Sequence, residues 1–239
     1  MTDESKEIKE CIPAWDSEYY ERYKQDEDAL ILYEQTVNYL RPKQNEKILD
    51  VGYGNGIVVK KLIDAGADVF GIDYSTAGVI AAKKLCENSR IIKASTTHLP
   101  FRKEIFDKII SLSTMEYLAE NDLEMCLRDV KRVLKQDGVV LIHIPNPWGE
   151  LVNRLYKKVF RKGSSSSKSK TLKSNKRVRE KAVGGKSYSP VSLRRILGIN
   201  GFNEEMWFGN RIPEKIPFRI RKRLIFLRGC GVFVQRDKR

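Results

Sequence analysis

The sequence predicts an α/β protein in which helices cover both faces of a mostly parallel sheet. Three observations support this class: short apolar runs alternate with amphipathic segments over residues 47–145, the first run ends in a glycine-rich turn, and the second ends in Asp73. Strands that are buried on both faces are near-continuous apolar runs, and regular strand–helix alternation is typical of parallel sheets. A chain of 239 residues is long enough for one large domain of this kind.

Each element is predicted from its local pattern of apolar residues. Strands are expected at 47–52, 68–73, 90–95, 106–113, 138–145, about 203–210 and 230–236, and helices within 14–40 and at about 57–65, 75–87, 120–135, 151–162 and 189–201. Residues 163–186 are rich in Ser, Lys and Gly, which predicts a loop. Residues 136–138, Gln-Asp-Gly, are expected to form a turn before the fifth strand.

The composition argues against several classes of protein. No run of about 18 apolar residues offers a membrane span, and the polar, acidic first ten residues are unlike a secretory signal peptide. We therefore expect the protein in the cytoplasm. The four cysteines are scattered and form no CxxC pair or zinc-finger spacing, so neither a disulfide framework nor a metal site is predicted.

The net charge of +14 is concentrated in the last third of the chain. Residues 1–156 carry 21 Lys/Arg against 26 Asp/Glu, a balance of −5. Residues 157–186 carry 12 against one and residues 211–239 carry ten against two. Cationic segments of this kind favour an anionic substrate or surface.

The most specific motif is the turn after the first strand. Asp50 is followed by glycines at positions 52, 54 and 56. Glycine lets a backbone turn tightly and approach a ligand closely. A dinucleotide-binding turn has the pattern GxGxxG, but here Ile57 stands where its third glycine would be. The remaining alternatives are a turn for a different ligand and an ordinary glycine-rich turn.

Asp73 ends the second expected strand, 17 residues after Gly56. A carboxylate at this point can accept hydrogen bonds from the ribose hydroxyls of a nucleoside. The alternative is an aspartate that caps the next helix.

The spacing of these glycines behind Asp50 resembles motif I of the class I S-adenosylmethionine-dependent methyltransferases. The resemblance extends through ASTTHLPF (94–101), FDKIISLSTMEYL (106–118) and RVLKQDGVVLIHIPNP (132–147), which are similar to the ubiquinone-biosynthesis-like branch, methyltransferase type 11. It implies a Rossmann-like sheet of seven strands that holds S-adenosylmethionine at the tips of the first two strands. It also implies methyl transfer as the activity.

The resemblance further implies which residues contact the cofactor. Asp50 is expected to order the loop or to reach the cofactor's amine. Ser95 stands where the branch usually has an adenine-binding Asp, so Thr96, the loop backbone and Leu99 are expected to replace it. The backbone at Ser113 is expected to meet the methionine end. The complete expected set is Asp50, Gly52, Tyr53, Gly54, Gly56, Asp73, Tyr74, Ser95, Thr96, Thr97, Leu99 and Ser113.

No catalytic base is identified. The branch often has a Glu-His pair after the fourth strand, and here the second residue is Tyr117, which either hydrogen-bonds the substrate or packs in the fold. Asn146 follows the fifth strand and either contacts the substrate or caps a loop. His98 falls in a cofactor-side loop, and His143 is expected to be structural. Methyl transfer depends mainly on positioning, so a missing base does not argue against activity.

Four parts of the chain follow from this interpretation. Residues 1–45 are expected to form a helical lid, 46–146 the S-adenosylmethionine-binding core, 147–229 a basic substrate-side insertion, and 230–239 a final strand and tail. An aromatic cluster near the amino terminus either closes over the cofactor or simply packs on the sheet; its members are Trp15, Tyr19, Tyr20 and Tyr23.

The expected acceptor is a small-molecule or lipid-linked, anionic compound. Residues 211–228 alternate cations with apolar residues, so a peripheral contact with a membrane surface is one interpretation, and packing on the sheet is another. An RNA methyltransferase is an alternative, although the sequence has no RRM or KH signature. A non-catalytic, cofactor-binding partner subunit is the second alternative.

Overall fold

The element order alternates strands and helices from β1 to β5, as the periodicity predicts. The computed structural model describes residues 15–24, 27–87, 89–144, 188, 190–208 and 230–236. Its elements are α2 (Ser17–Tyr23), α3 (Glu27–Leu40), β1 (Lys47–Val51), α4 (Ile57–Asp64), β2 (Asp68–Asp73), α5 (Thr76–Leu85), β3 (Arg90–Lys93), β4 (Phe106–Leu112), the 3-10 turn η2 (Met115–Tyr117), α6 (Glu120–Val133), β5 (Leu134–Ile144), α9 (Pro190–Ile199), β6 (Phe202–Phe208) and β7 (Cys230–Arg236).

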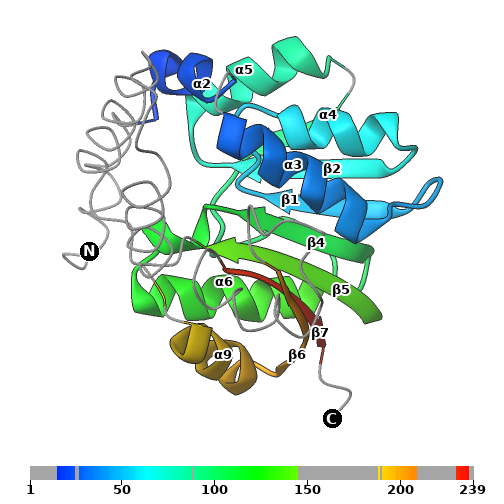
Figure 1. The fold of residues 1–239 in the computed structure, drawn as a ribbon, viewed down its shortest axis with the longest axis vertical. Coiled ribbons are helices and arrows are strands. Elements are labelled where there is room, and N and C mark those ends of the chain that lie inside the picture. The colour runs from blue at the N-terminus through cyan, green and yellow to red at the C-terminus, as the bar shows by residue number, and fades with distance from the viewer. Residues whose placement is uncertain are drawn as a thin grey trace, which may run out of the picture.

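The sheet has the order β3-β2-β1-β4-β5-β7-β6 (Figure 1). β1 to β5 are parallel, with registers such as Asp50↔Gly71 between β1 and β2 and Leu112↔His143 between β4 and β5. β7 pairs antiparallel with both β5 and β6. The predicted Rossmann-like parallel sheet is therefore confirmed for its five parallel strands. The chain order reverses between β1 and β4, and ligands bind outside the carboxyl ends of strands at such a point.

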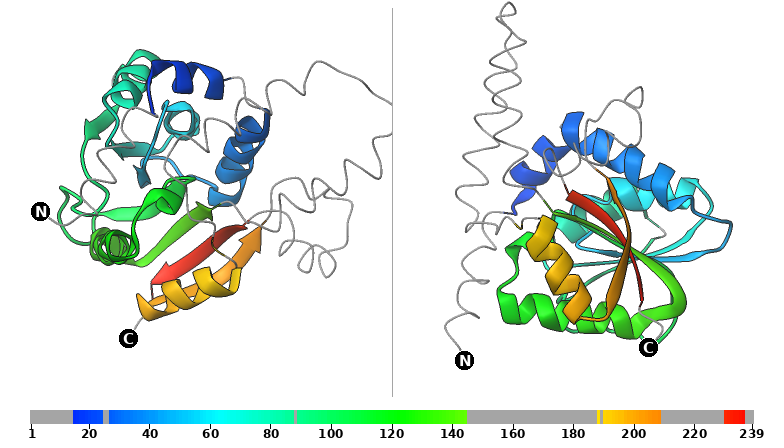
Figure 2. Two further views of the ribbon diagram at one scale, coloured as in Figure 1. Left: turned by 90° about the vertical axis from the view of Figure 1, so that its left-hand side faces the viewer. Right: turned by 60° about the horizontal axis from the view of Figure 1, so that its bottom comes forward.

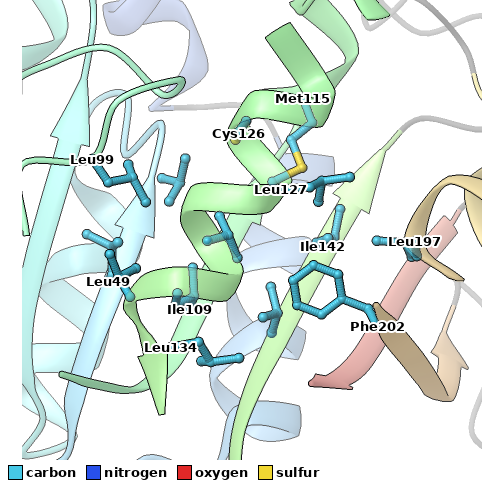
Figure 3. Close-up of a cluster of buried hydrophobic side chains, with 14 of the residues drawn as sticks. Leu49, Leu99, Ile109, Met115, Cys126, Leu127, Leu134, Ile142, Leu197 and Phe202 are labelled. Carbon is cyan, nitrogen blue, oxygen red and sulfur yellow. The ribbon is translucent and has the colours of Figure 1, made fainter. Parts of the chain in front are cut away.

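Helices cover both faces of this sheet (Figure 2). Alternate side chains of one strand enter different cores. In β1, Ile48 packs with α3 and α4, whereas Leu49 packs with α6. The α6 side continues to α9 and β6, where Leu127, Ile142, Leu197 and Phe202 gather in one buried cluster (Figure 3). Burial on both faces explains why these strands have apolar residues at consecutive positions.

The start of β5 corrects one expectation. The Gln-Asp-Gly segment 136–138 was predicted to be a turn before the strand, but β5 begins at Leu134, directly after α6. Leu134 is fully buried and pairs with Phe106, and the register shifts before Lys108 pairs with Val139. A buried anchor at Leu134 therefore extends the strand through polar residues that would otherwise favour a turn.

No helix in the described ranges is long and apolar enough to cross a membrane. The expected helix at 151–162, the basic loop 163–186 and the basic stretch 211–228 lie outside the described residues, as does Asn146.

Candidate functional site

The glycine-rich turn after β1 has the left-handed backbone that its sequence predicts. Gly52, Gly54 and Gly56 have φ angles of 84°, 56° and 77°, which residues with a Cβ rarely adopt. Gly52 is needed for a second reason, because a Cβ there would lie 2.2 Å from Oγ1 of Thr114. The loops after β1 and β4 therefore approach each other more closely than any side chain at position 52 would allow.

Asp73 ties the end of β2 to this turn. Its Oδ2 accepts a hydrogen bond of 2.8 Å from the backbone N–H of Gly54, and its Oδ1 accepts one of 2.7 Å from that of Ser75. Burial raises the pKa of the carboxyl group, and these N–H donors partly offset that effect. Each carboxylate oxygen has a second lone pair, so Asp73 can still accept a hydrogen bond from a ligand in the position that the sequence predicts for ribose.

Asp50 is a buried acid that can still accept a hydrogen bond from a ligand. Its side chain is 2% exposed, and its Oδ1 has no hydrogen-bond partner within the described part of the chain. Burial, followed by the negative charge of Asp73, raises its pKa well above the usual value. A buried carboxyl without a partner is unfavourable, and a bound cation would relieve the penalty. The amine and sulfonium of S-adenosylmethionine are cations, so the residues at this turn fit that molecule.

Tyr53 and Tyr74 flank the same acids. Tyr53 is buried, with its ring against the Cα of Gly71, and its hydroxyl has no partner among the described residues. Burial, then Asp73 and Asp50, raise its pKa. The ring of Tyr74 is partly exposed and lies 5.9 Å from the ammonium of Lys93.

The loop after β3 brings the expected adenine-side residues to the same edge of the sheet. The N–H of Ala94 donates to the carbonyl of Asp73 at 3.0 Å, which fixes the start of the loop beside β2. The hydroxyls of Ser95 and Thr97 are 2.9 Å apart, and Thr96 is buried. Leu99 packs in the α6-side core, so its contact with adenine stays a prediction.

An aspartate–arginine pair on α6 clamps this loop. Asp129 accepts from the N–H of Leu99 at 2.6 Å, and Arg132 donates to the carbonyls of Leu99 and Phe101 at 2.9 and 2.7 Å. Arg132 also donates to Asp129 at 2.8 Å. Burial opposes ionisation of Asp129, but the hydrogen bonds from Arg132 and Leu99 outweigh it and hold its pKa below the usual value. Sequence reasoning missed this clamp, because the partners are about 30 residues apart.

Ser113 lies just beyond β4, where the sequence predicts the methionine end of the cofactor. Its N–H donates to the carbonyl of His143 at 2.9 Å, and its Oγ lies 3.1 Å from Nδ1 of the same residue. Its φ of 53° is unusual for a residue with a side chain. The conformation holds the hydroxyl beside the imidazole.

Trp15 and the helix α2 that follows it pack against α5 and η2. Tyr20 is 5% exposed, and its hydroxyl lies 3.0 Å from the position that a Cβ of Gly78 would occupy. Burial, then Asp73, raises the pKa of Tyr20. The hydroxyl of Ser75 donates to the carbonyl of Trp15 at 3.0 Å, and the rings of Trp15 and Tyr117 make an edge-to-face contact at 5.3 Å. Part of the aromatic cluster thus spans from α5 to η2.

No group of three potential metal ligands occurs within the described ranges. The described residues that gather at this edge include the buried Asp50, the partly buried Asp73 and the aromatic residues Trp15, Tyr20 and Tyr117.

Comparison with known proteins identifies the class. Residues 49–142 match the family model described as a methyltransferase domain. This segment is a class I S-adenosylmethionine-dependent methyltransferase domain. The matched range begins in β1 and ends in β5, so it contains the glycine turn, both acids, the clamped loop and Ser113. S-adenosylmethionine is the cofactor of this class of domain.

Relatives extend the likeness beyond that segment. An uncharacterized protein of Methanocaldococcus jannaschii is 27% identical over 82% of this chain and 80% of its own length. A ubiquinone biosynthesis O-methyltransferase of Pelagibacter ubique is 28% identical over 43% of each chain, so the match spans less than half of either protein.

One solved structure has the same fold over nearly the whole chain. It is a chain in the complex between the Haloferax volcanii Trm112 methyltransferase activator and a methyltransferase, with a TM-score of 0.65, 16% identity, and coverage of 92% of this chain and 94% of that one. At this identity the likeness concerns the fold alone.

Proposed function

We propose that the protein transfers the methyl group of S-adenosylmethionine to a small-molecule or lipid-linked, anionic acceptor. The observation that carries the proposal is a pair of acids beside a three-glycine turn, of which Asp50 is buried and Asp73 is partly buried. A buried negative site suits a ligand with a cationic amine and sulfur, and it disfavours the pyrophosphate of a dinucleotide.

The contacts described above suggest a role for each residue of the site. S-adenosylmethionine supplies a methyl group on a positively charged sulfur, which is already activated for displacement. Asp73 holds the turn through Gly54 and offers its remaining lone pairs to the ribose. Asp50 would supply negative charge for the amine, and the clamped loop after β3 would hold the adenine. Such positioning, together with exclusion of water, accounts for most of what this type of catalysis needs.

The acceptor is proposed to lie between the aromatic cover and the carboxyl ends of β4 and β5. The contact between Trp15 and Tyr117 supports residues 1–45 as a lid over this space. The anionic character of the acceptor rests on the surplus of 11 positive charges in residues 157–186. We also propose a cytoplasmic protein of seven-stranded class I architecture, with residues 211–228 available for contact with a membrane surface.

Two alternatives remain worth testing. The cationic segments are equally suited to the phosphates of RNA. A partner subunit is the other candidate, since the Haloferax structure pairs a methyltransferase with an activator.

Calorimetric titration with S-adenosylmethionine and with NADH tests which cofactor the protein binds. We expect the protein to bind S-adenosylmethionine and not NADH. Asp73→Ala should weaken it by about 10- to 100-fold, because hydrogen bonds to a charged group contribute about 1.5–3 kcal/mol. Asp68→Ala is the matched control, since Asp68 lies at the opposite end of the same strand and pairs with Arg90. Preference for NADH, or equal loss in both variants, would contradict the proposal.

Transfer of a labelled methyl group tests the acceptor. The wild-type protein is incubated with labelled donor and separate pools of small metabolites, lipid extract and RNA. Incorporation into the first two pools supports the proposal, and incorporation into RNA alone favours the first alternative. Donor binding without incorporation, unless an added activator restores it, favours the non-catalytic subunit.

A further inference from the structure

The methyltransferase site contains a paired serine and histidine that the proposed function has not used. Ser113 follows β4 and His143 lies near the end of β5, on adjacent parallel strands. Their side chains meet with Oγ and Nδ1 3.1 Å apart, and the backbone N–H of Ser113 donates to the carbonyl of His143. Two contacts therefore fix the serine hydroxyl against the imidazole.

The serine is more exposed than the histidine. His143 is 6% exposed, whereas Ser113 is partly exposed. Of the two side chains, the serine hydroxyl is therefore the one that is more open to a ligand at the carboxyl edge of β4. Ser113 also has the unusual φ of 53°, and such strain in a residue with a side chain often marks a functional site.

The pairing matters for some acceptors and not for others. A neutral hydroxyl is a poor nucleophile until it loses its proton, so its methylation gains from a positioned base. An ionised thiol needs no base. A serine that leads to a buried imidazole is therefore useful when the acceptor atom is a hydroxyl oxygen.

We propose that the acceptor carries a hydroxyl group and that Ser113 and His143 remove its proton; this inference rests on the proposed methyltransferase function. The acceptor oxygen forms a bond to the methyl carbon, the carbon–sulfur bond breaks, and its electron pair stays on sulfur. The acceptor proton passes to Oγ of Ser113 while the serine proton passes to Nδ1 of His143. The positive charge of the sulfonium thus ends on the imidazole, which later releases its proton to water. Ser113 is the catalytic residue, and His143 acts through it as a positioning residue.

The relay makes a prediction about the resting protein. Nδ1 must accept a hydrogen bond, so the ring proton must be on Nε2. The chain has two histidines, and a His98→Gln variant leaves the signals of His143 alone in a ¹H–¹⁵N spectrum of the imidazole nitrogens. We expect the Nε2–H tautomer. A neutral ring protonated on Nδ1 would overturn the relay, whether or not the cofactor binds.

Activity separates a proton relay from a structural contact. Donor-saturated enzyme is assayed with a panel of phenols, alcohols and sugars, and with 4-nitrothiophenol as an ionised thiol. For the best hydroxyl acceptor, Ser113→Ala should lower kcat with little change in KM, and this loss should be about 100-fold larger than the loss in rate with the thiol. Ser111→Ala is the matched control, because Ser111 is a buried serine two residues earlier, within β4.

The outcomes of these experiments distinguish failure of the relay, of the acceptor class and of the proposed function. Equal loss on both acceptor types, or no loss on either, would show a structural serine and overturn the relay. A wild-type enzyme that binds the donor but methylates no hydroxyl in the panel would overturn the acceptor class. Failure of the donor to bind in calorimetry would instead overturn the proposed function, while the tautomer still reports on the relay.

Discussion

Asp50 is a residue whose burial lowers stability in the absence of a ligand. Burial and the nearby Asp73 raise its pKa, so the folded protein holds this proton more tightly than the unfolded chain does. Below the unfolded pKa of about 3.9 both states are protonated and the penalty vanishes. As the pH rises from there through the folded pKa, the unfolded chain ionises first and the free energy of unfolding falls.

Asp50→Asn should therefore stabilise the free protein near pH 7.5 by about 1 kcal/mol, which is typical of a single stabilising change. The gain should shrink toward pH 4, and affinity for S-adenosylmethionine should fall because the site loses its charge. Thermal unfolding at both pH values and calorimetry measure the two effects. Asp64→Asn, at an exposed position on α4, serves as the control. A less stable Asp50→Asn protein at pH 7.5 would refute this account.

Gly52 is required by its neighbour as well as by its φ angle. Gly52→Ala places a Cβ against Thr114 and should lower the free energy of unfolding by about 1–3 kcal/mol. Adding Thr114→Ala removes Oγ1 and Cγ2, the two nearest atoms, and should recover part of the loss. Denaturant unfolding of the four proteins in this double-mutant cycle measures the coupling. Strict additivity would mean that φ alone explains the glycine.

At the scale of elements, the α6 clamp is what holds the loop after β3. Arg132→Ala removes its donors to two loop carbonyls and should cost about 1.5–3 kcal/mol of stability. It should also weaken cofactor binding, because Ser95–Thr97 lose their support. Arg128→Ala is a control on the same helix, since that exposed residue makes a 3.7 Å ion pair with Glu124 and does not contribute to the clamp. Unchanged unfolding of Arg132→Ala, or equal losses in both variants, would contradict the clamp.

Periodicity predicted most element positions within two or three residues, because each strand of the parallel core is a distinct apolar run. β2 was predicted at its observed bounds, and α4, α5 and α9 differ by one or two residues at either end. β5 was the exception. Its early start depends on the burial of Leu134 against Phe106, a contact between distant segments that no local pattern encodes.

The same distinction applies to the site. Asp50, the glycines and Asp73 could be predicted from sequence because they lie within two short motifs. Thr114 and Arg132 were missed, since their roles depend on packing between loops. His143 was interpreted as structural from its place inside a strand, and its contact with Ser113 appears only when β4 and β5 are side by side.

At the scale of the whole molecule, charge is divided along the chain. Residues 1–156, which contain both candidate acids, have a net charge of −5, whereas residues 157–186 and 211–239 add +11 and +8. The segment that contains the methyltransferase domain is therefore acidic, and the segments expected on the acceptor side are basic. Attraction between exposed charges weakens as salt rises, so the salt dependence of catalysis reports how many charges the acceptor brings.

A small anionic acceptor should show a shallow salt dependence. Neutralising Z phosphates on single-stranded nucleic acid gives a slope of about −0.7Z in log affinity against log salt, so six or more contacts give about −4 or steeper. By the same arithmetic, the slope for an acceptor with one or two charges should be shallower than about −2. Measuring kcat/KM between low and high salt, with donor binding followed in parallel, separates the acceptor from the cofactor. A slope near −4 with constant donor affinity would replace the small-molecule acceptor with RNA, because only an extended polyanion engages that many cations at once.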